Sequence, residues 1–225
     1  MKAVFFLFLI FATAAISLYS QNCGYYYFQS NKTVTMGVFN KKGSSEGKVV
    51  YKIGSVNKSG GATIANINSE VFDKKNKSLG TSSGRMQCKG GMLLIDMSTM
   101  MSPQQSSQFK NAEVDGKGFY LEYPNTLKEG QTLKDGSLNL DVKMEGGIAA
   151  KIIMDITNRT VVAKESVTTP AGTWDAYKIT YSSKTVIDMG FAIPMKMDMT
   201  EWYVPNFGVV KSEYKTGKME LLSVE

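Results

Sequence analysis

The 225-residue chain carries 26 lysines and arginines against 20 aspartates and glutamates, a formal net charge of +6, and contains no histidine. Without histidine, Ser-His-Asp and Cys-His enzymes are excluded, and the usual imidazole ligand of a metal site is missing. Arginine, the side chain that best recognises phosphates, occurs only at Arg85 and Arg159, so we expect no nucleic-acid partner.

The first residues have the pattern of a secretory signal peptide. Lys2 precedes an apolar run over residues 3–18, and a polar stretch that includes Gln21 follows. The run is short for a bilayer-spanning helix, and no charged stop-transfer segment comes after it. We therefore predict a cleaved signal peptide over residues 1–20, a mature chain without an integral membrane span, and export to the periplasm or the extracellular space.

Two cysteines, Cys23 and Cys88, predict a disulfide, because an even cysteine count in an exported chain is typical of one. The bridge would tie the start of the mature chain to the rest of the fold. Lipidation of Cys23 is the alternative. It is disfavoured because Asn22 and Ser20 stand where a lipobox has a small residue and a leucine-like residue.

The mature chain has the pattern of β-strands separated by turns of Asn, Gly, Lys and Asp. In the third strand, Ala65, Ile67 and Ser69 are expected on one face and Asn66 and Asn68 on the other. The expected strands cover residues 33–39, 48–56, 62–73, 78–88, 92–97, 118–124, 137–143, 148–158, 160–167, 174–181, 195–204, 209–214 and 219–224.

Two places need separate interpretation. Residues 98–110 predict a short helix or an irregular excursion, with Ser102 as a cap and Pro103 as the first helical residue. Strands 148–158 and 160–167 are interpreted as a pair that turns at Asn158 and Arg159.

The fold class that follows is all-β. We expect a single domain over residues 21–225, in which one antiparallel sheet of about eleven or twelve strands curves strongly or forms a partly open barrel. No linker-like segment divides the chain. A sheet of this shape has a concave side that is either filled by side chains or left as a pocket.

Methionine is the unusual abundance. Met195, Met197 and Met199 share one face of a strand, which fits core packing, a flexible lining for an apolar ligand, or a soft metal such as Cu(I). Neighbours on one face lie about 6.6 Å apart along the strand, which is far for one small ion, so we expect no metal. The adjoining Trp202 and Tyr203 fit either core packing or an aromatic binding mouth.

Carboxylates are the remaining candidates for catalysis. No spacing among them predicts a reactive pair, and we interpret them as surface groups on alternating strand faces. We therefore expect no catalytic residue and no cofactor. The candidates are Glu113, Asp115, Glu122, Asp141, Asp155, Asp175 and Glu201.

Several motifs resemble an exported bacterial family, domain of unknown function 3108. They are the run from Thr169 to Trp174, which reads TPAGTW, the YKI at 177–179, the EWYVP at 201–205 and the GVVKSE at 208–213. The resemblance implies a strongly curved antiparallel sheet, similar to that of periplasmic lipoprotein carriers, and it implies no catalytic residues.

These observations predict a non-enzymatic β-domain that binds or carries an apolar molecule, such as a lipid or lipopeptide, on its concave face. Met195, Met197, Met199, Trp202 and Tyr203 are the expected ligand-binding residues. The alternative is a structural or assembly protein of the cell envelope that engages other proteins through its sheet edges. A hydrolase using Glu201 and Asp175 is a more distant reading.

Overall fold

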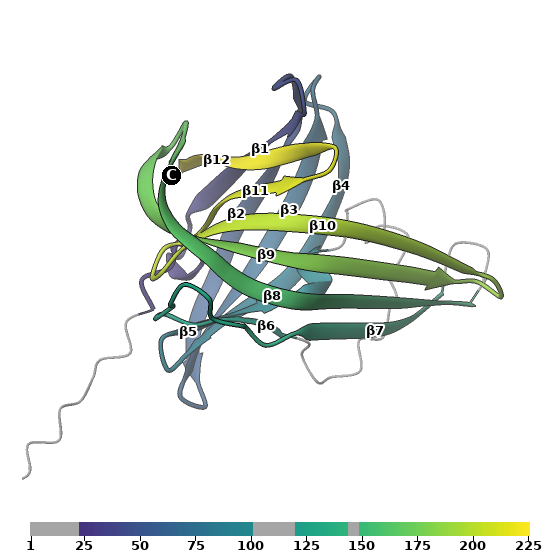
Figure 1. Cartoon of the computed structure of the whole chain (residues 1–225), viewed down its shortest axis with the longest axis horizontal. Coiled ribbons are helices and arrows are strands. Elements are labelled where there is room, and N and C mark those ends of the chain that lie inside the picture. The colour runs from purple at the N-terminus through teal and green to yellow at the C-terminus, as the bar shows by residue number, and fades with distance from the viewer. Residues whose placement is uncertain (1–22, 101–119, 144–148) are drawn as a thin grey trace, which may run out of the picture.

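One antiparallel sheet of twelve strands makes up the molecule (Figure 1). The structure is a computed structural model that describes residues 23–100, 120–143 and 149–225. The sheet curls into a nearly closed barrel, so the predicted fold class is confirmed. The predicted signal peptide and most of the excursion expected at 98–110 lie outside the described residues.

The strands succeed one another as hairpins along the chain. Their order in the sheet is β6-β5-β4-β3-β2-β1-β12-β11-β10-β9-β8-β7. The bounds are β1 (Thr33–Asn40), β2 (Ser45–Ser59), β3 (Ala62–Asp73), β4 (Ser78–Lys89), β5 (Met92–Asp96), β6 (Tyr120–Tyr123), β7 (Gly136–Lys143), β8 (Ala149–Thr169), β9 (Gly172–Asp188), β10 (Ala192–Val204), β11 (Gly208–Tyr214) and β12 (Gly217–Val224).

The sheet has two halves of six strands each. In each half the strands lie in chain order, and β1 pairs with β12 to join the halves. Two backbone hydrogen bonds of 2.9 Å between Thr33 and Glu225 extend this junction. In Figure 1, β2 to β4 cross behind the long strands β8 to β10, so the two halves enclose a concave interior.

Alternation of side chains positions the core, as β3 illustrates. Ala65, Ile67 and Ser69 are buried, whereas Asn66 and Asn68 are exposed. The prediction for this strand is therefore confirmed in both its bounds and its faces. The same period of two directs the apolar residues of neighbouring strands to the interior.

One strand prediction is wrong. Residues 148–158 and 160–167 do not form a hairpin but belong to the single long strand β8, which pairs with β9 along its length. Asn158 has a φ of 58° and lies in an irregularity between Thr157 and Thr160. Asparagine with positive φ serves a bulge as well as a turn, so the local signal was correct and its interpretation was not.

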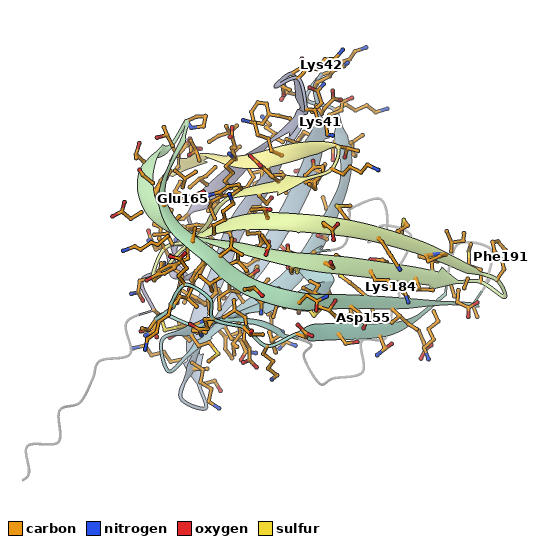
Figure 2. All side chains as sticks on the ribbon, viewed as in Figure 1. Lys41, Lys42, Asp155, Glu165, Lys184 and Phe191 are labelled. Atoms are coloured by element: carbon orange, nitrogen blue, oxygen red, sulfur yellow. A yellow bond between two sulfur atoms is a disulfide. The ribbon has the colours of Figure 1, made fainter. Side chains whose placement is uncertain are left out.

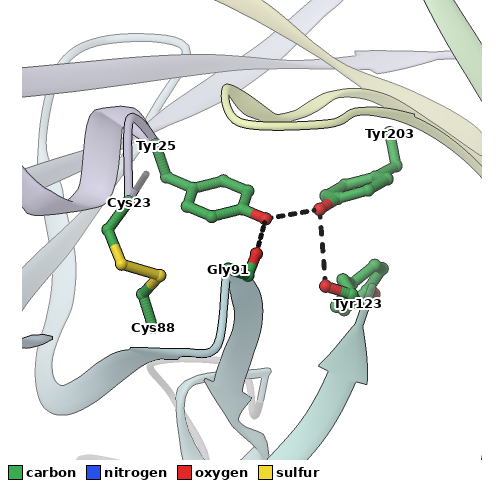
Figure 3. Close-up of a disulfide and its surroundings, with 6 residues drawn as sticks. All are labelled: Cys23, Tyr25, Cys88, Gly91, Tyr123 and Tyr203. Carbon is green, nitrogen blue, oxygen red and sulfur yellow. Dashed lines mark hydrogen bonds between the residues drawn. A yellow bond between two sulfur atoms is a disulfide. The ribbon is translucent and has the colours of Figure 1, made fainter. Parts of the chain in front are cut away.

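The first described residues are bonded to β4 and buried against the sheet (Figure 3). Cys23 and Cys88 form the predicted disulfide, with a Cα–Cα distance of 5.9 Å. The short 3-10 helix η1 (Tyr26–Phe28) follows, and Tyr25 and Tyr26 are fully buried. The Tyr25 hydroxyl donates to the Gly91 carbonyl oxygen at 2.7 Å and lies 3.0 Å from the Tyr203 hydroxyl.

Helical structure is otherwise limited, in the described ranges, to the 3-10 turn η2 (Met97–Met100) after β5. None of the helices in these ranges has the length and apolar character needed to cross a lipid bilayer.

Candidate functional site

The concave side of the sheet contains two neighbouring cavities of about 280 and 380 Å³. Both are lined by Met100, Tyr181 and Met199, which makes them adjoining parts of one interior space. Ligand pockets in proteins commonly have volumes of this order. The smaller cavity is lined by Met100, Met154, Ile156, Tyr181, Ser183, Thr185, Met195, Met197 and Met199.

The larger cavity lies beneath both halves of the sheet. It takes its walls from β1 to β5 and from β10 to β12, together with residues of η1, η2, β6 and β9. The lining residues are Tyr27, Met36, Val49, Tyr51, Ser69, Val71, Met86, Ile95, Thr99, Met100, Tyr123, Tyr181, Met199, Glu201, Val209, Ser212 and Met219.

The three methionines of β10 line the smaller cavity together. Met195 and Met197 are 43% and 45% exposed, and Met199 is more deeply placed where the cavities meet. Across the β9–β10 ladder they pair with Thr185, Ser183 and Tyr181 respectively. The structure therefore brings three of the five expected ligand-binding residues to one wall of the interior.

Glu201 is a cavity residue that sequence reasoning misplaced on the surface. It follows the methionines on the same face of β10 and is only 6% exposed. One carboxylate oxygen accepts a hydrogen bond from the Tyr123 hydroxyl at 2.7 Å, and the other accepts one from the Tyr181 hydroxyl at 2.6 Å. The period-two spacing from Met199 was the signal that could have placed it inside.

The two tyrosines that bind Glu201 are strongly perturbed. Burial raises the pKa of Tyr123 and Tyr181 well above the usual value, and the negative charge of Glu201 raises it further. Both hydroxyls consequently stay protonated at neutral pH and act as donors. Each oxygen of Glu201 therefore accepts a hydrogen bond from a neutral phenol.

Arg159 is the second polar residue whose place the sequence did not reveal. It is fully buried, and its Nη1 donates to the carbonyl oxygens of Glu122 at 3.0 Å and Lys134 at 2.7 Å. Its guanidinium carbon lies 4.7 Å from the centre of the Tyr123 ring. Arg159 therefore connects β8 to the end strand β6 and to the chain before β7, where the two edges of the sheet approach one another.

The bulge in β8 is what turns Arg159 inward. Before it, even-numbered residues such as Ile152 and Ile156 are buried; after it, odd-numbered residues such as Val161 and Val167 are buried. The extra residue at Asn158 shifts the alternation by one, which is the usual effect of a bulge.

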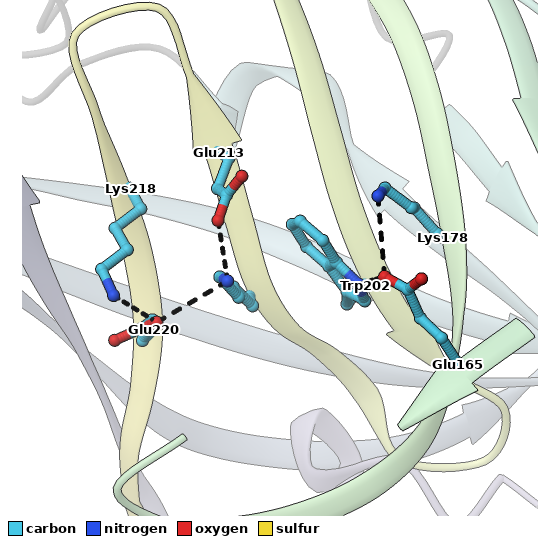
Figure 4. A network of polar contacts seen from close by, with 7 residues as sticks. Glu165, Lys178, Trp202, Glu213, Lys218 and Glu220 are labelled. Atoms are coloured by element: carbon cyan, nitrogen blue, oxygen red, sulfur yellow. Dashed lines mark hydrogen bonds and ion pairs between the residues drawn. The ribbon is translucent and has the colours of Figure 1, made fainter. Parts of the chain in front are cut away.

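Trp202 and Tyr203 do not line either cavity. Trp202 faces the outside of the sheet, where its indole Nε1 donates to Glu165 at 2.7 Å and the ammonium of Lys211 lies 4.5 Å from its ring (Figure 4). Tyr203 is fully buried, and its ring packs against that of Tyr25, the residue before η1. The structure therefore separates both residues from the methionine wall.

The outer face carries a network of ion pairs around Trp202 (Figure 4). Lys211 contacts Glu213 at 2.7 Å, and Lys218 contacts Glu220 at 2.7 Å. All four side chains are partly exposed, and ion pairs near the surface contribute little individually. Figure 2 shows further charged groups on the long strands, among them Asp155 on β8 and Lys184 on β9.

Metal ligands do not gather in the part of the chain that the structure describes. No group of three or more cysteine, aspartate or glutamate side chains lies close enough there to hold an ion. Asp155 instead accepts from Ser137 and Asp198 from Ser182, both at 2.7 Å. Among the described residues that line the two cavities, Glu201 is the one carboxylate, and most of the others are apolar or aromatic.

Two solved structures share this fold. One, from Bacteroides fragilis, is a protein inferred to be exported that has a YmcC-like fold; it is 20% identical, with a TM-score of 0.69, over 88% of this chain and 96% of its own. The other, from Parabacteroides distasonis, is inferred to be a lipoprotein; it is 19% identical, with a TM-score of 0.70, over the same shares of the two chains.

Sequence comparison gives the family. No curated protein matches the chain. The DUF3108-like family matches residues 29–225, which is nearly the whole described structure and includes the cavity, the β8 bulge and the motifs around Trp174 and Trp202. The chain therefore belongs to the DUF3108-like family.

Proposed function

We propose that this protein is an exported, non-catalytic binding protein that holds the apolar chain of a lipid or lipopeptide inside its curved sheet. The observation that carries the proposal is the pair of adjoining cavities on the concave side, with Met195, Met197 and Met199 along one wall. Methionine is flexible and polarisable, so it adapts to apolar molecules of variable shape.

Two further observations support export. The Cys23–Cys88 disulfide is of a kind that persists in oxidising compartments. Proteins with the same fold from two related bacteria are inferred to be an exported protein and a lipoprotein. These support a place in the cell envelope, where lipids and lipopeptides are available.

A substitution at the meeting point of the two cavities tests the proposal. Met199→Gln keeps the length of the side chain but places an amide in an apolar wall, which should weaken uptake of a fluorescent long-chain amphiphile by about fivefold or more. Met199→Leu, the matched control, should bind within about twofold of the parent protein, because its volume and polarity are conserved.

Native mass spectrometry of protein purified without detergent supplies the independent measurement. We expect a co-purifying lipid mass that is reduced in Met199→Gln. A parent protein that carries no lipid and takes up no amphiphile would refute the proposed function.

A second candidate, an assembly protein of the cell envelope, rests on the edge of β7. Within the described ranges this strand pairs with β8 and with no other strand. Asp141 on β7 is exposed and charged, and charged side chains on an edge strand are how natural sheets discourage unwanted pairing with other chains. Crosslinking in intact cells that gives discrete protein adducts through β7 would favour this candidate over the binding protein.

A further inference from the structure

The interior has a polar end, and its chemistry restricts the ligand. We propose that the cavity takes an amphiphile whose head group donates hydrogen bonds to Glu201 and carries no negative charge, such as an alkyl ammonium or an alcohol, and that it discriminates against a fatty carboxylate. This inference rests on the proposed function, since it requires that an apolar chain occupies the cavity.

Glu201 retains capacity for a ligand. Its two oxygens offer about four acceptor positions, of which Tyr123 and Tyr181 fill two. Its carboxylate forms no ion pair with any lysine or arginine in the described ranges, although the residue is only 6% exposed. A ligand donor would therefore meet an acceptor that is already oriented and dehydrated.

Hydroxyl groups surround this carboxylate. Ser212 is the direct cross-strand neighbour of Glu201 in the β10–β11 ladder and is 8% exposed. Tyr51 lines the same cavity from β2. Both hydroxyls adjoin the cavity rather than the closed core, since the buried polar atoms without a partner in the described part of the chain are Nε and Nη2 of Arg159. Beside one carboxylate, the two hydroxyls offer further hydrogen-bonding positions to a polar group in the cavity.

Tyr27 lines the same cavity as Glu201 and Tyr51. Burial raises the pKa of Tyr27 most, and the neighbouring Tyr51 and Glu201 raise it further. Glu201 comes from β10 and Tyr51 from β2. The polar end lies where the two halves of the sheet face one another.

The sign of the charge decides which head group is accepted. Like charges at a few ångströms repel strongly in a poorly solvated site, whereas an ammonium or hydroxyl is attracted to the carboxylate. Arg159 forms no ion pair with Glu201 in the described ranges, although its positive charge lowers the pKa of Tyr123 and Tyr181 and so offsets part of the effect of burial and of the Glu201 charge. A carboxylate head group would have to displace this arrangement.

The methionine wall gives the apolar chain its direction. Met195, Met197, Met199 and Glu201 lie on one face of β10, and the six residue steps from Met195 to Glu201 span roughly 20 Å along the strand. Figure 2 shows Phe191 at the far tip of the β9–β10 hairpin, and this side chain is 63% exposed. A chain bound with its head at Glu201 would run along the methionines toward that tip.

Matched single-chain amphiphiles test the inference. Myristylamine, myristyl alcohol and myristate have the same chain length and are compared at neutral pH by displacement of a neutral fluorescent reporter, N-phenyl-1-naphthylamine. We expect the amine and the alcohol to displace the reporter at concentrations at least about tenfold lower than myristate does.

Variants locate the discrimination. In Glu201→Gln the difference between amine and myristate should fall below about threefold, because glutamine keeps a similar shape without the charge. Asp175→Asn, an exposed carboxylate on β9, should leave the difference unchanged. Ser212→Ala leaves both tyrosine hydrogen bonds to Glu201 intact and should weaken the binding of myristyl alcohol by about threefold or more. This variant provides a test if Glu201→Gln fails to fold.

The outcomes separate the two proposals. Displacement by myristate at equal or lower concentration, or discrimination that persists in a folded Glu201→Gln protein, overturns the head-group inference while the cavity remains a binding site. No displacement by any of the three amphiphiles, with no uptake of the reporter, overturns the proposed function itself.

Discussion

Arg159 shows how a single side chain can hold the seam of a nearly closed sheet. Its guanidinium reaches carbonyl oxygens on both sides of the gap between β6 and β7, while Nε and Nη2 have no hydrogen-bond partner in the described part of the chain. Burial of a charged group without a carboxylate is costly, so the contacts that remain must offset the cost. The ring of Tyr123, 4.7 Å away, supplies one of them.

Replacing Arg159 with methionine should destabilise the protein by about 2–4 kcal/mol, because the carbonyl oxygens of Glu122 and Lys134 lose their donor. Urea unfolding measures the change, and hydrogen exchange should show faster opening of β6. Arg85→Met is the matched control. It changes the only other arginine, which is exposed on β4, and should shift the unfolding free energy by less than about 0.5 kcal/mol. Equal effects of the two substitutions would contradict the assigned role.

Among the structural elements, η1 is fixed by more than its covalent link. The Cys23–Cys88 bridge joins the residues before it to β4, the backbone N–H of Tyr26 donates to Phe207 at 3.1 Å, and the Tyr26 hydroxyl donates to the Val209 carbonyl oxygen at 2.7 Å. The segment 23–28 therefore contacts both halves of the sheet. Its contacts should keep the native fold when the bridge is removed.

Removing the bridge should cost stability without changing the fold. The two cysteines are 65 residues apart, and closing a loop of that size in the unfolded chain corresponds to about 4 kcal/mol at most. Cys23→Ser/Cys88→Ser should lower the urea midpoint while the far-ultraviolet circular dichroism stays that of the parent. Treatment with dithiothreitol should lower the urea midpoint of the parent protein by a similar amount and should leave that of the variant unchanged. A variant as stable as the parent would contradict this expectation.

The elements also show how far a sequence of this kind can be interpreted. Period-two patterns and turn residues predicted nearly all strands, including both bounds of β3, because each depends on local chemistry. They failed at Asn158, because an asparagine that adopts positive φ in a bulge cannot be told from one in a turn by sequence. The period-two spacing could have placed Glu201 on the inner face, but its partners Tyr123 and Tyr181 come from β6 and β9, which no local pattern reveals. Arg159 was missed because the bulge at Asn158 reverses the alternation and its partners lie on β6 and before β7.

At the scale of the whole molecule, the sheet encloses an unusual number of tyrosines. Burial raises the pKa of Tyr26, Tyr27, Tyr123, Tyr181 and Tyr203 well above 10, and it raises the pKa of Tyr51 to about 12. Neutral hydroxyls are thus a condition of the folded state. This links the stability of the barrel to pH in the alkaline range.

Stability should fall steeply above about pH 10. Between pH 10 and the raised folded values, unfolded tyrosines lose protons that folded tyrosines keep, so unfolding releases protons and is favoured as pH rises. The contribution is complete below pH 10 and disappears as pH rises through 12 for Tyr51 and higher for the others. Urea unfolding from about pH 8 to about pH 11 measures it, and Tyr51→Phe should give a shallower decline. A flat profile over this range would contradict the burial of these groups.

The pairing of β1 with β12 bears on how such a barrel is completed. During synthesis, β1 can pair with β2 as soon as both have emerged, yet its other edge stays bare until the last strand of the sheet arrives. Two separate meanders must then meet through strands made at the beginning and at the end. The nascent protein consequently remains an incomplete, aggregation-prone intermediate until synthesis ends. Any factor that shields the free edge of β1 from other chains would raise the yield of folded protein.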